Sequence, residues 1–240
     1  MHEFGEADEL GIIAINLGAL FMGHTTLHSE HPESRHQCLI YEGEPSRHLP
    51  TLVGAMRDKL RQNFRCMFLD SAPMVVGMRL SLAKAGVDVM SEMASGRLVL
   101  TSERNYLIRG RRFDADRMMQ GLAAALHEAL NSDFEGLWAT GNICWELGPA
   151  RDFSQLLEYE WRLEDFVRNH PQFGGICQYH RDTVPRDAVI DCVLSHSTVF
   201  INQTRTLKNP HVADPRVYQK QSRENPAIEK FVQEVCHLTA

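Results

Sequence analysis

The chain has 240 residues, a formal net charge of −6 at pH 7, 43% hydrophobic residues and 23% charged residues. These values fit one α/β domain with appendages or two small domains, and the acidic balance argues against nucleic acid as the main partner. Six cysteines are scattered through apolar segments without a C-x-x-C pair, which favours reduced thiols in a cytoplasmic protein over disulfides.

Apolar runs alternate with helical repeats along the chain. The first run, residues 10–22, is too short to span a bilayer and lacks the basic start of a signal peptide, so no membrane partner is expected. Short apolar runs predict six strands, at 37–41, 66–70, 97–102, 137–141, 175–179 and 198–202. Most are continuous rather than alternating, which is typical of strands covered on both faces.

Helical patterns fill the intervals between these runs. Ser71 is predicted to cap a helix that ends at Gly86, and Asp114 a helix with an apolar stripe at Met118, Leu122, Leu126 and Leu130. Asp152 or Ser154 is expected to cap the next helix. The further helical repeats lie at 52–60, 156–167 and 190–194. The order predicts a three-layer α/β fold with a mostly parallel sheet of about six strands and helices on both faces.

The C-terminal part changes character. Residues 203–226 are polar, contain three prolines, and are interpreted as a linker or extended arm. Beyond them, Ile228, Phe231, Val232, Val235 and Leu238 predict an amphipathic terminal helix that docks on its own core or on a dimer partner.

The sequence argues against nucleotide hydrolysis. The first predicted strand is followed by 41–48, YEGEPSRH, which has one glycine, two carboxylates and no lysine. A phosphate loop needs G-x-x-x-x-G-K-[ST], whose backbone N–H groups and lysine hold the phosphates. No G-x-S-x-G nucleophile motif is present either, and Ser195-His196-Ser197 follows a helix rather than a strand.

Two other kinds of site remain open. His36-x-Cys38 and Cys177-x-x-His180 have ligand types and spacings compatible with zinc or another transition metal. Alternatively, the turn 140–146 joins a strand to a helix, where open α/β sheets bind ligands, and Trp145 beside Cys144 would form a pocket wall. Glu146, Glu158 and Glu160 could supply an acid or base, but Glu158 and Glu160 do not share a helix face, so at most one points inward. The basic patch Arg104, Arg109, Arg111 and Arg112 is expected to be a solvated loop.

The motifs together resemble a known family. His36-Gln-Cys38-Leu-Ile-Tyr41, Ala85-Gly86-Val87-Asp88-Val89, Ser95-Gly96-Arg97-Leu98-Val99-Leu100, Arg112-Phe113-Asp114, Thr140-Gly141 with Trp145, Glu158-Tyr159-Glu160 and Cys177-Gln178-Tyr179 are similar to the MEDS domain, a sensory domain of methanogens and methylotrophs. The similarity covers roughly residues 34–203 and leaves an N-terminal segment, 1–33, and a C-terminal arm, 204–240. Asn142 and His180 depart from the family pattern, which tends to have acidic residues there.

The resemblance implies a RecA/KaiC-like core that has lost its phosphate loop and senses small hydrocarbon derivatives in prokaryotic signal transduction. We therefore expect a non-catalytic regulator without a cofactor, acting as a homo-oligomer. It would control transcription through a DNA-binding or kinase partner. The alternatives are a metal-binding protein or enzyme using the same crevice, with His36, Cys38, Cys177 and His180 as ligands, and a ligand-free interaction module. The expected ligand-binding residues are His36, Cys38, Tyr41, Thr140, Gly141, Asn142, Cys144, Trp145, Glu146, Glu158, Cys177, Tyr179 and His180.

Overall fold

A computed structural model describes residues 35–240, except 106, 109–111 and 219–223. The predicted N-terminal segment and its apolar run 10–22 therefore lie outside the described residues. So do Arg109 and Arg111 of the basic patch.

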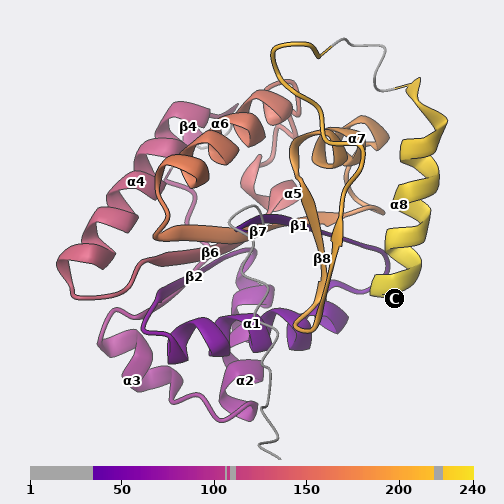
Figure 1. Cartoon of the computed structure of the whole chain (residues 1–240). Helices are drawn as coiled ribbons and strands as arrows, with labels where there is room; N and C mark the ends of the chain where they lie inside the picture. The colour runs from indigo at the N-terminus through magenta and orange to yellow at the C-terminus, as the bar shows by residue number, and fades with distance from the viewer. Residues whose placement is uncertain (1–34, 106, 109–111, 219–223) are drawn as a thin grey trace, which may run out of the picture. The chain divides into compact units, whose positions relative to one another are not determined.

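Seven strands form one sheet, in the order β3-β2-β6-β7-β1-β8-β9 (Figure 1). The strands of this sheet are β1 (His36–Tyr41), β2 (Arg65–Leu69), β3 (Leu98–Thr101), β6 (Leu137–Asn142), β7 (Phe173–His180), β8 (Thr198–Asn202) and β9 (Arg205–Lys208). All neighbouring pairs are parallel except β8 and β9, which are antiparallel. Two short strands, β4 (Leu107–Ile108) and β5 (Arg112–Phe113), make a separate antiparallel pair.

Helices cover both faces of the sheet. The helices are α1 (Leu49–Arg61), α2 (Ala72–Lys84), α3 (Val89–Ala94), α4 (Ala115–Asn131), α5 (Ile143–Glu146), α6 (Leu156–Asn169), α7 (Arg186–Ser195) and α8 (Pro226–Thr239). Figure 1 shows α1, α2 and α3 on one side of the sheet and α4, α6 and α7 on the other. The predicted three-layer α/β fold with a mostly parallel sheet is confirmed.

Alternation along the strands divides the core in two. In β1, Leu39 and Tyr41 pack with α1 and α2, whereas Cys38 and Ile40 belong to the core beneath α4, α6 and α7. Successive side chains of a strand point to opposite faces, so one strand supplies both layers. Position parity therefore decides which of the two cores each strand residue can reach.

The helix ends test the predicted caps. The Asp114 carboxylate accepts a hydrogen bond from the Arg117 backbone N–H at 3.1 Å, as predicted for the start of α4. The prediction for α6 is wrong, because its N-cap is Gln155, while the Asp152 carboxylate accepts from the Ser154 N–H in the preceding turn. The apolar stripe of α4 is buried only in part, since Leu130 is 40% exposed.

The predicted linker contains a strand that the sequence did not indicate. β9 lies at 205–208 and pairs with β8, so residues 203–226 are not simply an extended arm. Its sequence, RTLK, is mostly exposed and polar, which is typical of an edge strand. Because it contains no apolar run, the sequence pattern did not predict it. The short helix α3 and the strands β4 and β5 were likewise not predicted.

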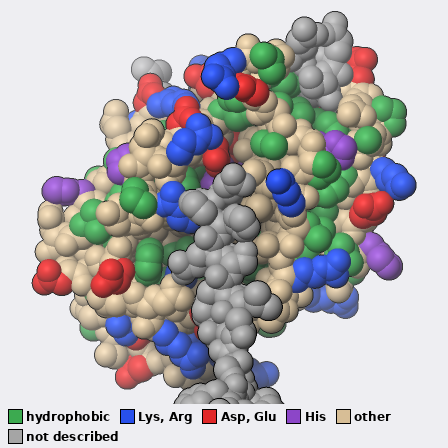
Figure 2. Space-filling model, viewed as in Figure 1, with side chains coloured by type: hydrophobic (Ala, Val, Ile, Leu, Met, Phe, Trp, Pro, Cys, Tyr) green, Lys and Arg blue, Asp and Glu red, His purple; other side chains and the backbone are tan. Residues whose placement is uncertain are grey.

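The terminal helix α8 is amphipathic, as predicted. Its buried residues Ile228, Val232 and Val235 belong to the core beneath α7, and Thr239 donates a hydrogen bond to the Ile40 carbonyl of β1 at 2.9 Å. None of the described helices is both long and apolar enough to cross a membrane. On the face shown in Figure 2, basic and acidic side chains are interspersed.

Candidate functional site

Strand alternation separates the predicted site residues into two groups. Cys38, Cys177 and Tyr179 point into the core beneath α4, α6 and α7, and His36 contacts Cys177 there. Tyr41 points into the opposite core. The expected single site is therefore divided by the sheet.

His180 lies with Tyr41 on that opposite face. The two rings stack with centroids 5.0 Å apart, and His48 packs against the same tyrosine at 4.3 Å. The predicted metal ligands His36, Cys38, Cys177 and His180 therefore do not converge. The reason is the period of two, because His180 is an odd number of residues from Cys177 within β7.

The turn 140–146, predicted to form a pocket wall, also provides the N-cap of α5. The Asn142 side chain accepts a hydrogen bond from the Trp145 N–H at 3.2 Å and so starts α5. Trp145 is partly exposed and lies under the Arg104 guanidinium, 4.4 Å from the ring centroid. Cys144 donates to the Thr183 carbonyl at 3.8 Å. These three predicted site residues have local structural partners.

Thr140 and Gly141 have different roles in the same strand. The Thr140 hydroxyl donates to the Ile176 carbonyl at 2.7 Å and accepts from the Gln178 amide at 2.9 Å. A Cβ at position 141 would stand 1.6 Å from the Glu146 carboxyl oxygen Oε1, so a larger residue there would displace the carboxyl group. The backbone of β6 thus makes room for the carboxyl group of Glu146.

The two glutamates of α6 behave as the helix period predicts. Glu160 is completely buried, whereas Glu158 is exposed. The expected ligand-binding residue Glu158 thus lies away from the buried groups, and Glu160 takes its place. Glu158 lines a separate open hollow of about 380 Å³, together with Arg112, Asp116 and Arg162.

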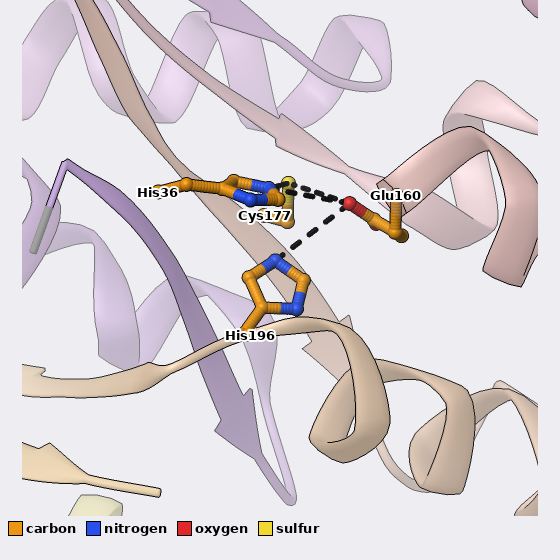
Figure 3. Close-up of side chains that lie close together, drawn as sticks. All are labelled: His36, Glu160, Cys177 and His196. Carbon is orange, nitrogen blue, oxygen red and sulfur yellow. Dashed lines mark hydrogen bonds and ion pairs between the residues drawn. The ribbon is translucent and has the colours of Figure 1, made fainter. Parts of the chain in front are cut away.

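A buried polar cluster forms around Glu160 (Figure 3). It consists of His36, Glu160, Cys177 and His196, whose ligand atoms all lie within 4.8 Å of one another. Glu160 Oε2 is 3.3 Å from His36 Nε2 and 3.7 Å from His196 Nε2, and Cys177 Sγ is 3.6 Å from both His36 Nε2 and Glu160 Oε2. The Tyr179 hydroxyl donates to the other oxygen of Glu160. We call His36, Glu160, Cys177 and His196 the buried cluster.

Four separate elements supply the cluster. His36 begins β1, Cys177 lies in β7, Glu160 lies on α6, and His196 follows α7 immediately before β8. Because β1 pairs with β7 in parallel, with Cys38 opposite Cys177, the His36 and Cys177 side chains meet on one face. The cluster lies under α6 and α7, not at the carboxyl ends of the strands.

The charges within the cluster are unequal. Burial alone would lower the pKa of His36, but its hydrogen bonds with Glu160 and Glu164 raise it to about 9. Burial and the neighbouring His36 lower the pKa of His196 to about 4, so His196 is neutral at pH 7. Burial would raise the pKa of Glu160, yet His196, His36 and Tyr179 hold it below its ordinary value. At neutral pH, the cluster therefore contains one charged and one neutral imidazole beside a carboxylate.

The sequence reasoning missed His196 and Glu164, and it named Glu160 as a possible acid or base but not among the expected ligand-binding residues. Glu160 and Glu164 are four residues apart, which places them on one helix face, and Glu160 sits within the apolar pattern of α6. That combination could have indicated an inward-facing carboxylate. His196 gives no local signal, because only the packing of the segment before β8 brings it to Glu160.

A small cavity of about 30 Å³ borders the cluster, with room for one or two water molecules. His36 and Cys177 belong to both the cluster and the cavity. Thr140, Gly141 and Glu146 also line it, so three residues of the predicted turn do reach the cavity. The remaining walls are largely apolar and include Leu69, Met118, Leu122, Ala139, Tyr159, Leu163, Phe173, Gly175 and Ile176.

Glu146 is the cavity's unusual acid. It is 4% exposed, and burial together with the Glu160 and Asp70 carboxylates raises its pKa to about 8. The carboxyl group is therefore mostly protonated at pH 7 and can donate a hydrogen bond. The cavity thus combines apolar walls with a neutral acid, Glu146, and the charged His36.

A family comparison covers this whole region. The model of the MEDS family, described as the methanogen/methylotroph, DcmR sensory domain, matches residues 35–197. The chain belongs to the MEDS family. The matched range of this MEDS domain includes all four residues of the buried cluster and every wall of the cavity.

The chain was also compared with solved structures and with curated proteins. Among solved structures, the chain is similar to an uncharacterized protein from Pyrococcus horikoshii, solved in complex with an unknown peptide, with 16% identity and a TM-score of 0.48. The similarity covers 79% of this chain and 90% of the other. A comparison with curated proteins finds no match.

Proposed function

We propose that the MEDS domain is a non-catalytic sensor that binds a ligand of very few non-hydrogen atoms in the cavity between the sheet, α4 and α6. The observation that carries this proposal is the cavity itself, where apolar walls surround a few buried polar groups. Its volume of about 30 Å³ suits a one-carbon compound and is far too small for a nucleotide. Glu146 would donate a hydrogen bond to an oxygen or halogen of such a ligand.

Several features favour sensing over catalysis. Burial and the Glu160 carboxylate raise the pKa of the Cys177 thiol well above its usual value, so this sulfur is a poor nucleophile. The pKa of the Tyr179 hydroxyl is raised in the same way, so it stays protonated and does not readily give up its proton. In addition, the turn after β1 lacks the glycines and lysine of a phosphate loop. These groups suit recognition better than proton or group transfer.

The signal would pass to an output protein, such as a DNA-binding or kinase component. The sensory family of the domain supports this role. Ligand binding would shift the population between arrangements of α4 and α6 over the sheet, because these helices close the cavity. The chain would work in this way as a homo-oligomer.

A binding screen with a cavity-filling variant tests the proposal. Small alcohols, carboxylates and halocarbons are screened for an increase in the melting temperature of the wild-type protein. Leu122→Phe fills the cavity, whereas Leu130→Phe makes the same change on the exposed part of α4. We expect a ligand that stabilises the wild type and Leu130→Phe but not Leu122→Phe.

A second filling variant, Ala139→Val on β6, serves if Leu122→Phe does not fold, as judged by circular dichroism. The proposal fails if none of the compounds stabilises the wild-type protein. It also fails if a folded filling variant responds to the ligand as the wild type does.

A further inference from the structure

Four of the six separations within the buried cluster match a metal coordination shell, and the other two are within 4.8 Å. Zinc binds nitrogen and oxygen ligands at about 2.0–2.1 Å and thiolate sulfur at about 2.3 Å. In a tetrahedron, these lengths separate two nitrogen or oxygen ligands by about 3.3 Å and sulfur from either by about 3.6 Å. The observed separations are 3.3 and 3.7 Å from Glu160 Oε2 to the two imidazoles, and 3.6 Å from Cys177 Sγ to His36 and Glu160.

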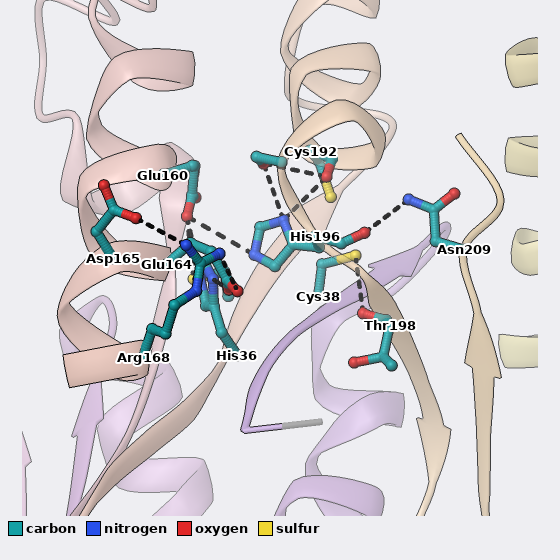
Figure 4. A network of polar contacts seen from close by, with 12 residues as sticks. His36, Cys38, Glu160, Glu164, Asp165, Arg168, Cys192, His196, Thr198 and Asn209 are labelled. Atoms are coloured by element: carbon teal, nitrogen blue, oxygen red, sulfur yellow. Dashed lines mark hydrogen bonds and ion pairs between the residues drawn. The ribbon is translucent and has the colours of Figure 1, made fainter. Parts of the chain in front are cut away.

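Both imidazoles are held with Nε2 turned inward (Figure 4). His36 Nδ1 donates to the Glu164 carboxylate at 2.9 Å, and His196 Nδ1 donates to the Cys192 carbonyl at 2.9 Å. A carboxylate or carbonyl behind the other ring nitrogen is the usual support of a metal-bound histidine. The Asn209 amide also donates to the His196 carbonyl at 2.7 Å, which fixes the backbone of that residue.

His196 leaves a lone pair pointing at a carboxylate. Since its Nδ1 carries the proton, its Nε2 is an acceptor, and this atom has no hydrogen-bond partner although the side chain is 0% exposed. Glu160 Oε2 lies 3.7 Å away and is an acceptor as well. Two buried acceptors that face each other cost free energy unless a proton or a cation lies between them. A metal ion among the four ligand atoms satisfies both.

We propose that His36 Nε2, Glu160 Oε2, Cys177 Sγ and His196 Nε2 bind one divalent transition-metal ion, with zinc as the ion that best fits this donor set. Imidazole and thiolate favour zinc and its neighbours over magnesium and calcium, which prefer oxygen ligands. Binding replaces the Cys177 S–H bond and the His36 Nε2–H bond with bonds to the metal, and the two protons leave to solvent.

This inference does not depend on the sensing proposal. If the sensing proposal also holds, the ion would border the cavity, because His36 and Cys177 line both. A ligand in the cavity would then lie beside the ion. The metal site would exist even if no small molecule bound there.

A second set, Cys38, Cys192 and His196, also lies within 4.8 Å. It offers one histidine and two thiols but no carboxylate. The Cys38 thiol already donates to the Thr198 carbonyl at 3.9 Å. His196 Nδ1 is the ring nitrogen on the Cys192 side, and it is occupied by the Cys192 carbonyl. The four-residue set therefore fits better, and Cys38→Ser distinguishes the two.

The test begins with the wild-type protein, purified without an affinity tag. We expect about one equivalent of metal by elemental analysis. After removal with a chelator, saturable binding of Co²⁺ should produce a thiolate-to-cobalt absorption band, and Zn²⁺ should displace the cobalt. The metal proposal is overturned if the purified protein contains no stoichiometric metal and also shows no saturable Co²⁺ binding. That result would leave the outcome of the ligand screen, and so the sensing proposal, unaffected.

Variants then locate the site. Cys177→Ser should abolish the thiolate band and weaken Zn²⁺ binding at least tenfold, whereas Cys66→Ser, a buried cysteine on the opposite face, should change neither. Glu164→Ala should keep the band but weaken binding by about 10-fold to 100-fold, because it removes only the acceptor that supports His36 Nδ1. Circular dichroism confirms folding. The assignment is wrong if a folded Cys177→Ser variant retains the band, or if Cys38→Ser alone removes it.

Discussion

Glu146→Gln removes a buried acid whose ionisation opposes folding. The pKa of Glu146 is 4.5 in an unperturbed chain and about 8 in the folded protein, where burial and the Glu160 and Asp70 carboxylates disfavour its charge. Between these values, the unfolded chain has released the proton while the folded protein retains it. Stability contributed by this group is therefore fully present below pH 4.5 and is lost as the pH rises to about 8.

The magnitude follows from the two pKa values. At about 1.4 kcal/mol for each pH unit, the interval from 4.5 to about 8 corresponds to about 5 kcal/mol, an upper bound because the surroundings relax. Glutamine has nearly the same shape and cannot ionise. At pH 4.5, the variant and the wild type should have similar free energies of unfolding. At pH 8.5, the variant should be the more stable by up to about 5 kcal/mol.

Urea unfolding followed by circular dichroism at pH 4.5, 6.5 and 8.5 measures this difference, with a chelator present so that metal binding does not contribute. Other titrating groups are common to both proteins and cancel in the comparison. Glu158→Gln, at an exposed position of α6, is the control and should follow the wild type. The reasoning is refuted if the stability difference between Glu146→Gln and wild type changes by less than about 1 kcal/mol over this range.

Substitutions at three further positions test the fold and the cluster by urea unfolding. Asp114→Ala removes the cap that accepts from the Arg117 N–H and should cost about 1 kcal/mol, whereas Asp114→Asn should retain most of it. Tyr179→Phe removes the hydroxyl that donates to buried Glu160 and should cost about 1.5–3 kcal/mol in metal-free protein; an unchanged stability would mean that water replaces it. Val235→Ala at the fully buried face of α8 should cost about 2 kcal/mol, and a negligible loss would show that α8 contributes little to the core.

Local sequence patterns predict most of the strands of this fold. The six apolar runs coincide with β1, β2, β3, β6, β7 and β8 to within two residues at each end. This succeeds because a strand buried on both faces must be apolar throughout, whatever its neighbours are. β9 escapes the same reasoning, since an edge strand is held by backbone hydrogen bonds to β8 and its polar side chains remain in solvent.

The sequence predicted some residues of the candidate site but not how they come together. Motif positions gave His36 and Cys177, and the turn gave Thr140, Gly141 and Glu146, which all line the cavity. The helix period also correctly allowed only one of the two α6 glutamates to point inward. Tyr41 and His180 were grouped with these residues although strand alternation, visible in the sequence, sends them to the other face.

The sequence by itself determined the α/β class, the order of most strands and helices, the MEDS resemblance and the absence of a phosphate-loop motif after β1. Each of these depends on local period, composition or motif. Only the tertiary structure decided that His36, Glu160, Cys177 and His196 meet. Residues from β1, α6, β7 and the segment before β8 converge because β1 pairs beside β7 and because α6 and α7 pack on that face. No spacing along the chain encodes that contact, since it is set by which strands pair and which face each helix covers.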